Sequence, residues 1–118
     1  MQSELTQSSW VNDVARCLDG VVVDAHPALN VAFALTDEKN ESGALFLSDG
    51  KCSLAEAVHD TVDLYVELPT STIVAMQNRV DELVVGYMRG AVKISGDPGT
   101  VIAFLKGVSL CARALRGK

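Results

Sequence analysis

The sequence predicts an α/β domain of the α+β type, in which a five-stranded sheet is combined with about five helices. Apolar and polar residues alternate over residues 62–68 and again over residues 92–94, and this period of two is typical of half-buried strands. Between these strands, the apolar residues of segment 80–87 recur at helical spacing. Asp49-Gly50 is a strong hairpin signal earlier in the chain. Such a scaffold builds an apolar space between a sheet and short helices, which favours binding over catalysis.

The length and composition indicate a single domain spanning residues 1–118. The chain is 48% hydrophobic and 5% aromatic, which fits a packed core and argues against disorder. No run reaches the ~20 apolar residues of a membrane helix. The first residues lack the basic start and apolar middle of a signal peptide. We therefore expect a cytoplasmic protein.

Charge is unevenly distributed along the chain, whose net charge is -5. Residues 1–67 contain twelve acidic and three basic residues, whereas residues 68–118 contain three acidic and seven basic residues. The acidic half argues against nucleic acid as a partner. Near the C-terminus, Lys106, Arg113 and Arg116 lie close to one face of an expected helix. This face is either an ordinary solvated surface or a patch for transient contact with an anionic membrane.

The N-terminal third is expected to hold one helix and the first strand. Ser8 or Ser9 can cap a helix that has one apolar stripe, and Gly20 can end it. A connector follows over residues 21–27, because its final proline disfavours helical geometry in the residue before it. Larger apolar residues then alternate with alanines over residues 31–35, which predicts the first strand.

The Asp49-Gly50 turn sets the register of the next two strands. Glycine supplies the positive φ that a two-residue primed turn requires. The resulting register places Leu47 opposite Cys52 and also Leu45 opposite Leu54. Both strands then present apolar residues on one side of the sheet.

The second half of the chain contains two further helix starts. Pro69 closes the strand at residues 62–68, and Thr70 can cap a short helix. Asp97 is an expected N-cap with Pro98 at the first helical position. Apolar residues at i, i+3, i+4 and i+7 follow, which predicts an amphipathic C-terminal helix.

Three segments together resemble the sterol carrier protein family, the type-two sterol-transfer or lipid-binding domain. They are the hairpin at residues 48–50, the strand at residues 62–68, and the stretch 86–98 that looks like the family's final strand and helix entry. The resemblance implies a mixed, mostly antiparallel sheet with helices over one face. It also implies an apolar cavity for a sterol, fatty acid or acyl-CoA, and a carrier rather than an enzyme. No cofactor or metal is expected.

The ligand-contact residues are inferred from the direction in which each side chain faces. Ordinary core packing is the alternative for every one of them. Met76 and Met88 favour the ligand side, since flexible thioethers suit a cavity of variable filling. The expected set is Phe33, Leu35, Leu47, Leu64, Val66, Ile73, Met76, Val84, Met88, Ile102, Phe104 and Leu105.

A rival hypothesis is a small isomerase or cyclase that acts on an apolar natural product in the same cavity. Its acid and base groups would come from His26, His59, Asp60, Asp63 and Tyr65. Nucleophile-elbow and His-x-x-His spacings are both absent from the sequence. The two histidines are therefore better explained as surface or hinge residues.

A third hypothesis is an interaction module that forms a homodimer. Ala32, Ala34, Ala44 and Ala91 could make the outer face of the sheet flat enough to self-associate.

The three cysteines are odd in number and widely spaced, which fits neither a disulfide framework nor a zinc site. We interpret them as small buried hydrophobic residues.

Overall fold

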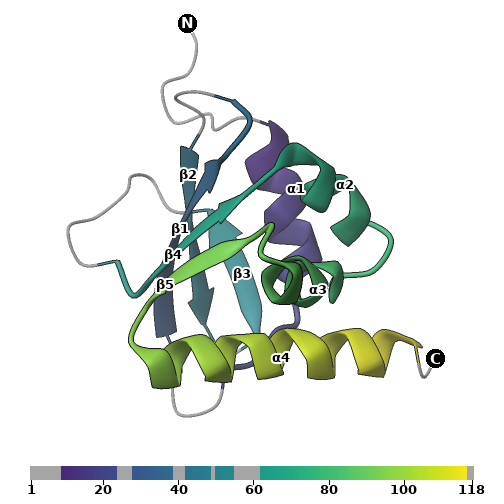
Figure 1. The fold of residues 1–118 in the computed structure, drawn as a ribbon. Coiled ribbons are helices and arrows are strands. Elements are labelled where there is room, and N and C mark those ends of the chain that lie inside the picture. The colour runs from purple at the N-terminus through teal and green to yellow at the C-terminus, as the bar shows by residue number, and fades with distance from the viewer. Residues whose placement is uncertain (1–8, 24–27, 39–41, 49, 55–61, 117–118) are drawn as a thin grey trace, which may run out of the picture.

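The protein is built from five strands and four helices in the part of the chain that the structure describes (Figure 1). The structure is a computed structural model, and it describes residues 9–23, 28–38, 42–48, 50–54 and 62–116. In chain order the elements are α1 (Ser9–Leu18), β1 (Ala28–Leu35), β2 (Ser42–Ser48), β3 (Lys51–Leu54), β4 (Leu64–Leu68), α2 (Thr70–Met76), α3 (Glu82–Arg89), β5 (Lys93–Gly96) and α4 (Pro98–Arg116).

The strands form one sheet in the order β3-β2-β1-β4-β5. β1 pairs antiparallel with β2 and parallel with β4. The outer pairs β2–β3 and β4–β5 are antiparallel. The predicted five-stranded, mixed and mostly antiparallel sheet is therefore confirmed.

The β2–β3 hairpin has the register that the sequence predicted. Leu47 pairs with Cys52, and Leu45 pairs with Leu54. Gly50 has a φ of +82°, a left-handed conformation that glycine adopts without steric cost. Asp49 lies outside the described residues.

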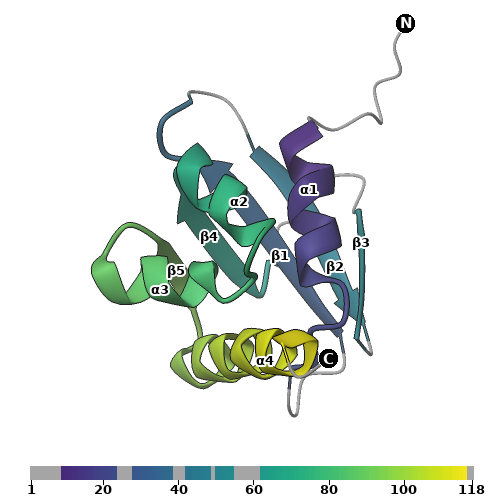
Figure 2. The same cartoon turned by 90° about the vertical axis from the view of Figure 1, so that its right-hand side faces the viewer.

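The helices lie on one side of the sheet. Figure 2 shows α1 and α2 in front of the strands, α3 beside them, and α4 crossing below. The described residues hold four helices, one fewer than the sequence led us to expect. No helix among these residues is long and apolar enough to cross a membrane.

The core is one hydrophobic cluster between the sheet and the helices. Leu64, Val66 and Leu68 of β4 are fully buried, whereas Tyr65 on the opposite face is 40% exposed. This alternation follows the period of two that the sequence shows. Phe104 of α4 is also fully buried and belongs to the same cluster, so α4 closes the core rather than lying on its surface.

Three helix starts were predicted to be capped, and the structure confirms the cap of α4; at the start of α1, Ser8 lies outside the described residues. The Thr100 amide donates to Asp97 Oδ2 over 3.2 Å, which is the N-cap arrangement expected for α4. Thr70, in contrast, does not cap α2, whose N-cap residue is Pro69 without a side-chain bond. The Thr70 amide instead donates to the carboxylate of Asp37. The acceptor is supplied from the segment after β1.

Candidate functional site

Most of the residues expected to contact a ligand meet in the core cluster. Seven of the twelve are 0–3% exposed, and three more pack against them while partly buried. They fill the space between sheet and helices in the described part of the chain, where the sequence predicted an apolar cavity. The buried seven are Phe33, Leu47, Leu64, Val66, Ile73, Met76 and Phe104, and the partly buried three are Leu35, Val84 and Leu105.

Met88 and Ile102 differ from this group. Met88 of α3 is 80% exposed and Ile102 of α4 is 67% exposed, so neither faces the sheet as the sequence reasoning expected. Helical spacing explains this, because Ile102 is two positions from the fully buried Phe104 and Met88 is five positions from the fully buried Leu83, and residues at these spacings point in different directions from a helix. The expectation that these two side chains point into the core was wrong.

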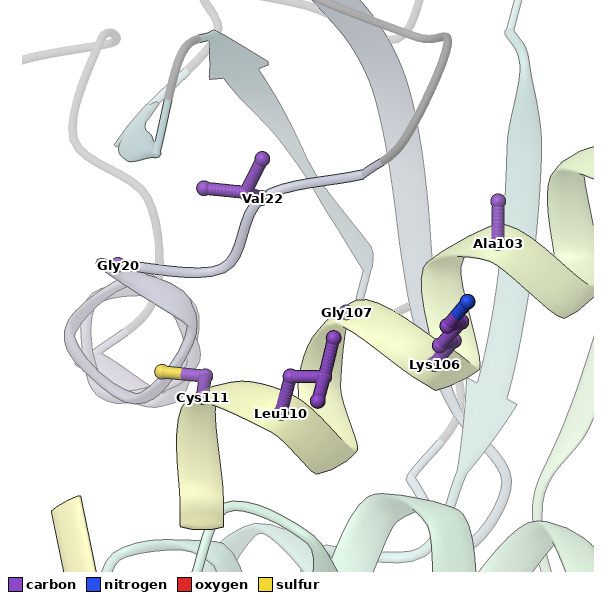
Figure 3. Close-up of a pocket in the computed structure, with 7 residues that line it drawn as sticks. All are labelled: Gly20, Val22, Ala103, Lys106, Gly107, Leu110 and Cys111. Carbon is purple, nitrogen blue, oxygen red and sulfur yellow. The ribbon is translucent and has the colours of Figure 1, made fainter. Parts of the chain in front are cut away.

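A surface groove of about 230 Å³ runs between α4 and the connector that follows α1. Figure 3 shows Leu110 and Cys111 on the α4 side of this groove and Val22 on the connector side. Lys106 is the charged residue of the lining. The described residues that line it are Gly20, Val22, Ala103, Lys106, Gly107, Leu110 and Cys111.

Gly107 explains why α4 and the connector approach so closely. A Cβ at this position would overlap the Val22 carbonyl oxygen, and it would lie 3.2 Å from the carbonyl carbon and 3.3 Å from Val21 Cγ1. The absence of a side chain at Gly107 therefore lets the backbone of the connector rest directly on the helix.

A second pocket, of about 470 Å³, lies between α1 and the segment after α2. Its lining is more polar, and it includes an ion pair between Asp13 and Arg16. Met76 contributes to its floor although it is only 2% exposed. Met76 is thus the residue of the expected ligand set that reaches this pocket.

The three cysteines have free thiols and are partly buried. Burial, together with the nearby charge of Asp19, raises the pKa of the Cys52 thiol to about 12. The pKa values of Cys17 and Cys111 are also raised, again mainly by burial. A thiol with a raised pKa is a poor nucleophile at neutral pH, so these residues act as small apolar groups that pack against the core.

Of the five groups named for an enzyme, the structure describes Asp63 and Tyr65. Tyr65 lies on the outer face of the sheet. The carboxylate of Asp63 accepts a hydrogen bond of 2.8 Å from the Asn30 amide, and it thereby ties β1 to β4. His26, His59 and Asp60 lie outside the described residues. No group of three His, Cys, Asp or Glu side chains placed to hold a metal occurs among the residues described.

Three of the four alanines proposed for self-association lie in the sheet, whereas Ala91 precedes β5 and is outside it, so its inclusion was wrong. Ala32 and Ala44 pair with each other across β1 and β2, and they are 1% and 6% exposed. Ala34 pairs with Ser42 two positions along the same two strands. Dimerisation through the outer face of the sheet stays a prediction.

Sequence reasoning missed the groove beside α4, although a signal for it was present. Ala103, Gly107 and Cys111 follow each other at i, i+4 and i+8, so they form a line of small side chains along one helix face. Such a line permits close packing of another backbone. The partner segment, which passes Gly20 and Val22, could not be identified from spacing alone.

Comparison with solved structures identifies the fold. The SCP2 structure of the ubiquinone synthesis protein UbiJ has a TM-score of 0.51 at 16% identity, over 91% of this chain and 84% of that one. The palmitated sterol carrier protein 2-like protein SCP2L2 of Aedes aegypti has a TM-score of 0.54 at 12% identity, over 85% and 91%. The chain thus has the fold of sterol carrier protein 2 domains, as its resemblance to that family predicted.

The same fold also occurs as part of a larger protein. A double mutant of the sec-alkylsulfatase PisA1 has a TM-score of 0.55 at 21% identity, over 86% of this chain. This chain spans only 16% of the sulfatase. No protein-family model and no curated protein sequence matches the chain.

Proposed function

We propose that this protein binds an apolar small molecule and carries it without altering it chemically. The observation that carries the proposal is the sterol carrier protein 2 fold, which one similar protein shows in a palmitated form. The ligand would be a sterol, a fatty acid or an acyl-CoA, and exchange would occur by partition. The sheet and the helices supply apolar side chains from both sides, which is the composition that small apolar ligands require.

The proposed ligand space is the interface between the inner face of the sheet and α4. Leu64 and Val66 would form its sheet wall, and Phe104 and Leu105 would form its helix wall. These side chains pack together in one hydrophobic cluster. A ligand would therefore have to displace them, and unbranched Met76 can change rotamer at low cost. Met88 and Ile102 lie outside this proposed ligand space, because both side chains are largely exposed.

The carrier proposal is tested by titrating delipidated protein with a fluorescent fatty acid and a fluorescent sterol. We expect at least one probe to bind at micromolar concentration, with displacement by its unlabelled counterpart. Mass spectrometry of the freshly purified protein should detect a co-purified lipid. Failure of both probes to bind, together with a lipid-free purified sample, would refute the carrier proposal.

The same proposal includes contact with an anionic membrane through Lys106, Arg113 and Arg116. A carrier of apolar ligands needs a source of them, and a membrane is such a source. Lys106 and Arg113 are exposed on α4. Arg116 is the last residue of α4, and its side chain lies outside the described residues. A cytoplasmic location also stays a proposal.

A further inference from the structure

The solvent-facing side of α4 carries an unusual mixture of side chains. Ile102, Lys106, Leu110 and Arg113 follow at i, i+4, i+8 and i+11, so they form one stripe along the helix. Ile102 is 67% exposed and Leu110 is 49% exposed. An ordinary solvated helix face is polar throughout. Here large apolar side chains alternate with basic ones.

The apolar part of this surface extends beyond the helix. Val22, on the connector, is 59% exposed, and it lines the same groove as Lys106 and Leu110 (Figure 3). The contact of Gly107 with the Val22 backbone holds the connector beside the helix. The five residues Val22, Ile102, Lys106, Leu110 and Arg113 therefore make one surface, which we call the α4 surface.

The charge of this region is opposite to that of the whole chain. Residues 98–118 contain four basic residues and no Asp or Glu, although the chain has a net charge of -5. Two described acidic residues lie near the ends of the α4 surface. Asp97 precedes the helix and bonds to Thr100, and Asp19 lies close enough to Cys111 to influence its thiol. Among the residues that the structure describes, the middle of the α4 surface is therefore basic and apolar.

We propose that the α4 surface docks on an anionic lipid bilayer. Ile102, Leu110 and Val22 would enter the boundary between headgroups and acyl chains, while Lys106 and Arg113 would contact lipid phosphates. Interfacial helices bind in this way, through an apolar stripe beside Lys and Arg. Long basic side chains also reach the headgroups while their stems remain in apolar surroundings. This proposal gives the carrier a site of ligand exchange and in that respect rests on the proposed function, but the docking itself does not require a bound ligand.

A planar, multiply charged partner fits the α4 surface better than a single anion or a second copy of the chain. Lys106 and Arg113 are seven residues apart, which corresponds to roughly 10 Å along a helix. A single phosphate would leave the exposed Ile102 and Leu110 side chains in water, whereas a bilayer offers several headgroups for the two cations and an apolar boundary for these side chains. A twofold dimer through this surface would bring like charges together, which disfavours self-association at this place.

The test is co-flotation of the protein with vesicles of phosphatidylcholine alone or with phosphatidylglycerol at a ratio of seven to three. Binding is expected only to the anionic vesicles and should weaken at high salt. Each cation near an anionic surface contributes about a fivefold change in affinity. Lys106→Gln combined with Arg113→Gln should therefore weaken binding roughly 25-fold. Lys93→Gln, which removes an exposed base from β5, should leave binding unchanged.

The apolar contribution is tested with a second pair of variants. Ile102→Ser with Leu110→Ser should reduce binding to anionic vesicles at least tenfold, whereas Val74→Ser on α2 should not, although Val74 is 58% exposed. All variants should keep the melting temperature and fatty-acid affinity of the parent protein in vesicle-free solution. That solution assay separates failure of docking from failure of the carrier proposal.

Three results would overturn the docking proposal. One is equal binding to neutral and anionic vesicles. Another is anionic binding that survives both the Lys106/Arg113 and the Ile102/Leu110 substitutions. The third is a dimer in solution that dissociates when Ile102 and Leu110 are replaced, which would assign the α4 surface to self-association.

Discussion

Gly107 offers a sharp test of how α4 is held against the rest of the molecule. Gly107→Ala places a methyl group where it overlaps the Val22 carbonyl oxygen, and the nearest atoms are backbone rather than a flexible side chain. Overpacking of this kind typically costs about 1–3 kcal/mol. Helix propensity acts in the opposite direction, because alanine is favoured over glycine inside a helix by roughly 1 kcal/mol. We therefore expect a net loss of stability of up to about 2 kcal/mol.

The measurement is urea denaturation followed by far-ultraviolet circular dichroism, with thermal melting alongside it. A matched control is Gly99→Ala in the first turn of α4. Its Cβ would lie 3.2 Å from Asp97 Oδ2, which belongs to a side chain that can move. The control should be neutral or slightly stabilising. If Gly107→Ala instead stabilised the protein by about 1 kcal/mol, which is the gain expected from helix propensity alone, the close contact between α4 and the connector would not exist in solution.

Two further predictions concern the start of α4 and the thiols. Asp97→Ala removes the acceptor for the Thr100 amide and should lower the free energy of unfolding by on the order of 1 kcal/mol. Asp97→Asn should retain most of the stability. A loss of fatty-acid affinity at an unchanged melting temperature would instead place Asp97 in the binding site. Burial is the main cause that raises the pKa of the Cys52 thiol from 9.0 to about 12, so the folded state favours the neutral thiol. This contribution to stability is present below pH 9 and is lost as the pH rises towards 12. Cys52→Ser should therefore show a shallower loss of stability than the parent protein over that range in urea titrations; parallel curves would contradict the raised pKa.

The strands could be predicted from the sequence because their signal is local. The alternation in β4 depends only on which side chains face the core, and Leu64 and Val66 are indeed fully buried. The β2–β3 register depends on one turn at Gly50. Each of these inferences needs only a few neighbouring residues, so tertiary packing had little opportunity to change the outcome.

Features that depend on distant segments could not be predicted in this way. The cap of α2 comes from Asp37, 33 positions before Thr70, and no local rule connects these two residues. The outward direction of Met88 and Ile102 depends on how α3 and α4 rotate against the sheet. The spacing of apolar residues defines an apolar stripe on a helix. Packing against the sheet then decides which residues at the edges of that stripe are buried.

The two faces of α4 link the proposed ligand space to the proposed membrane contact. Phe104 and Val108 on one face belong to the core, while Leu110 on the other belongs to the α4 surface. A bilayer that binds the outer face therefore acts on the same helix that closes the apolar interior. It can favour an open arrangement only to the extent that it binds that arrangement more tightly than the closed one. The contact between Gly107 and Val22 opposes this opening. Moving α4 away from the core must break that contact as well as the packing of Phe104.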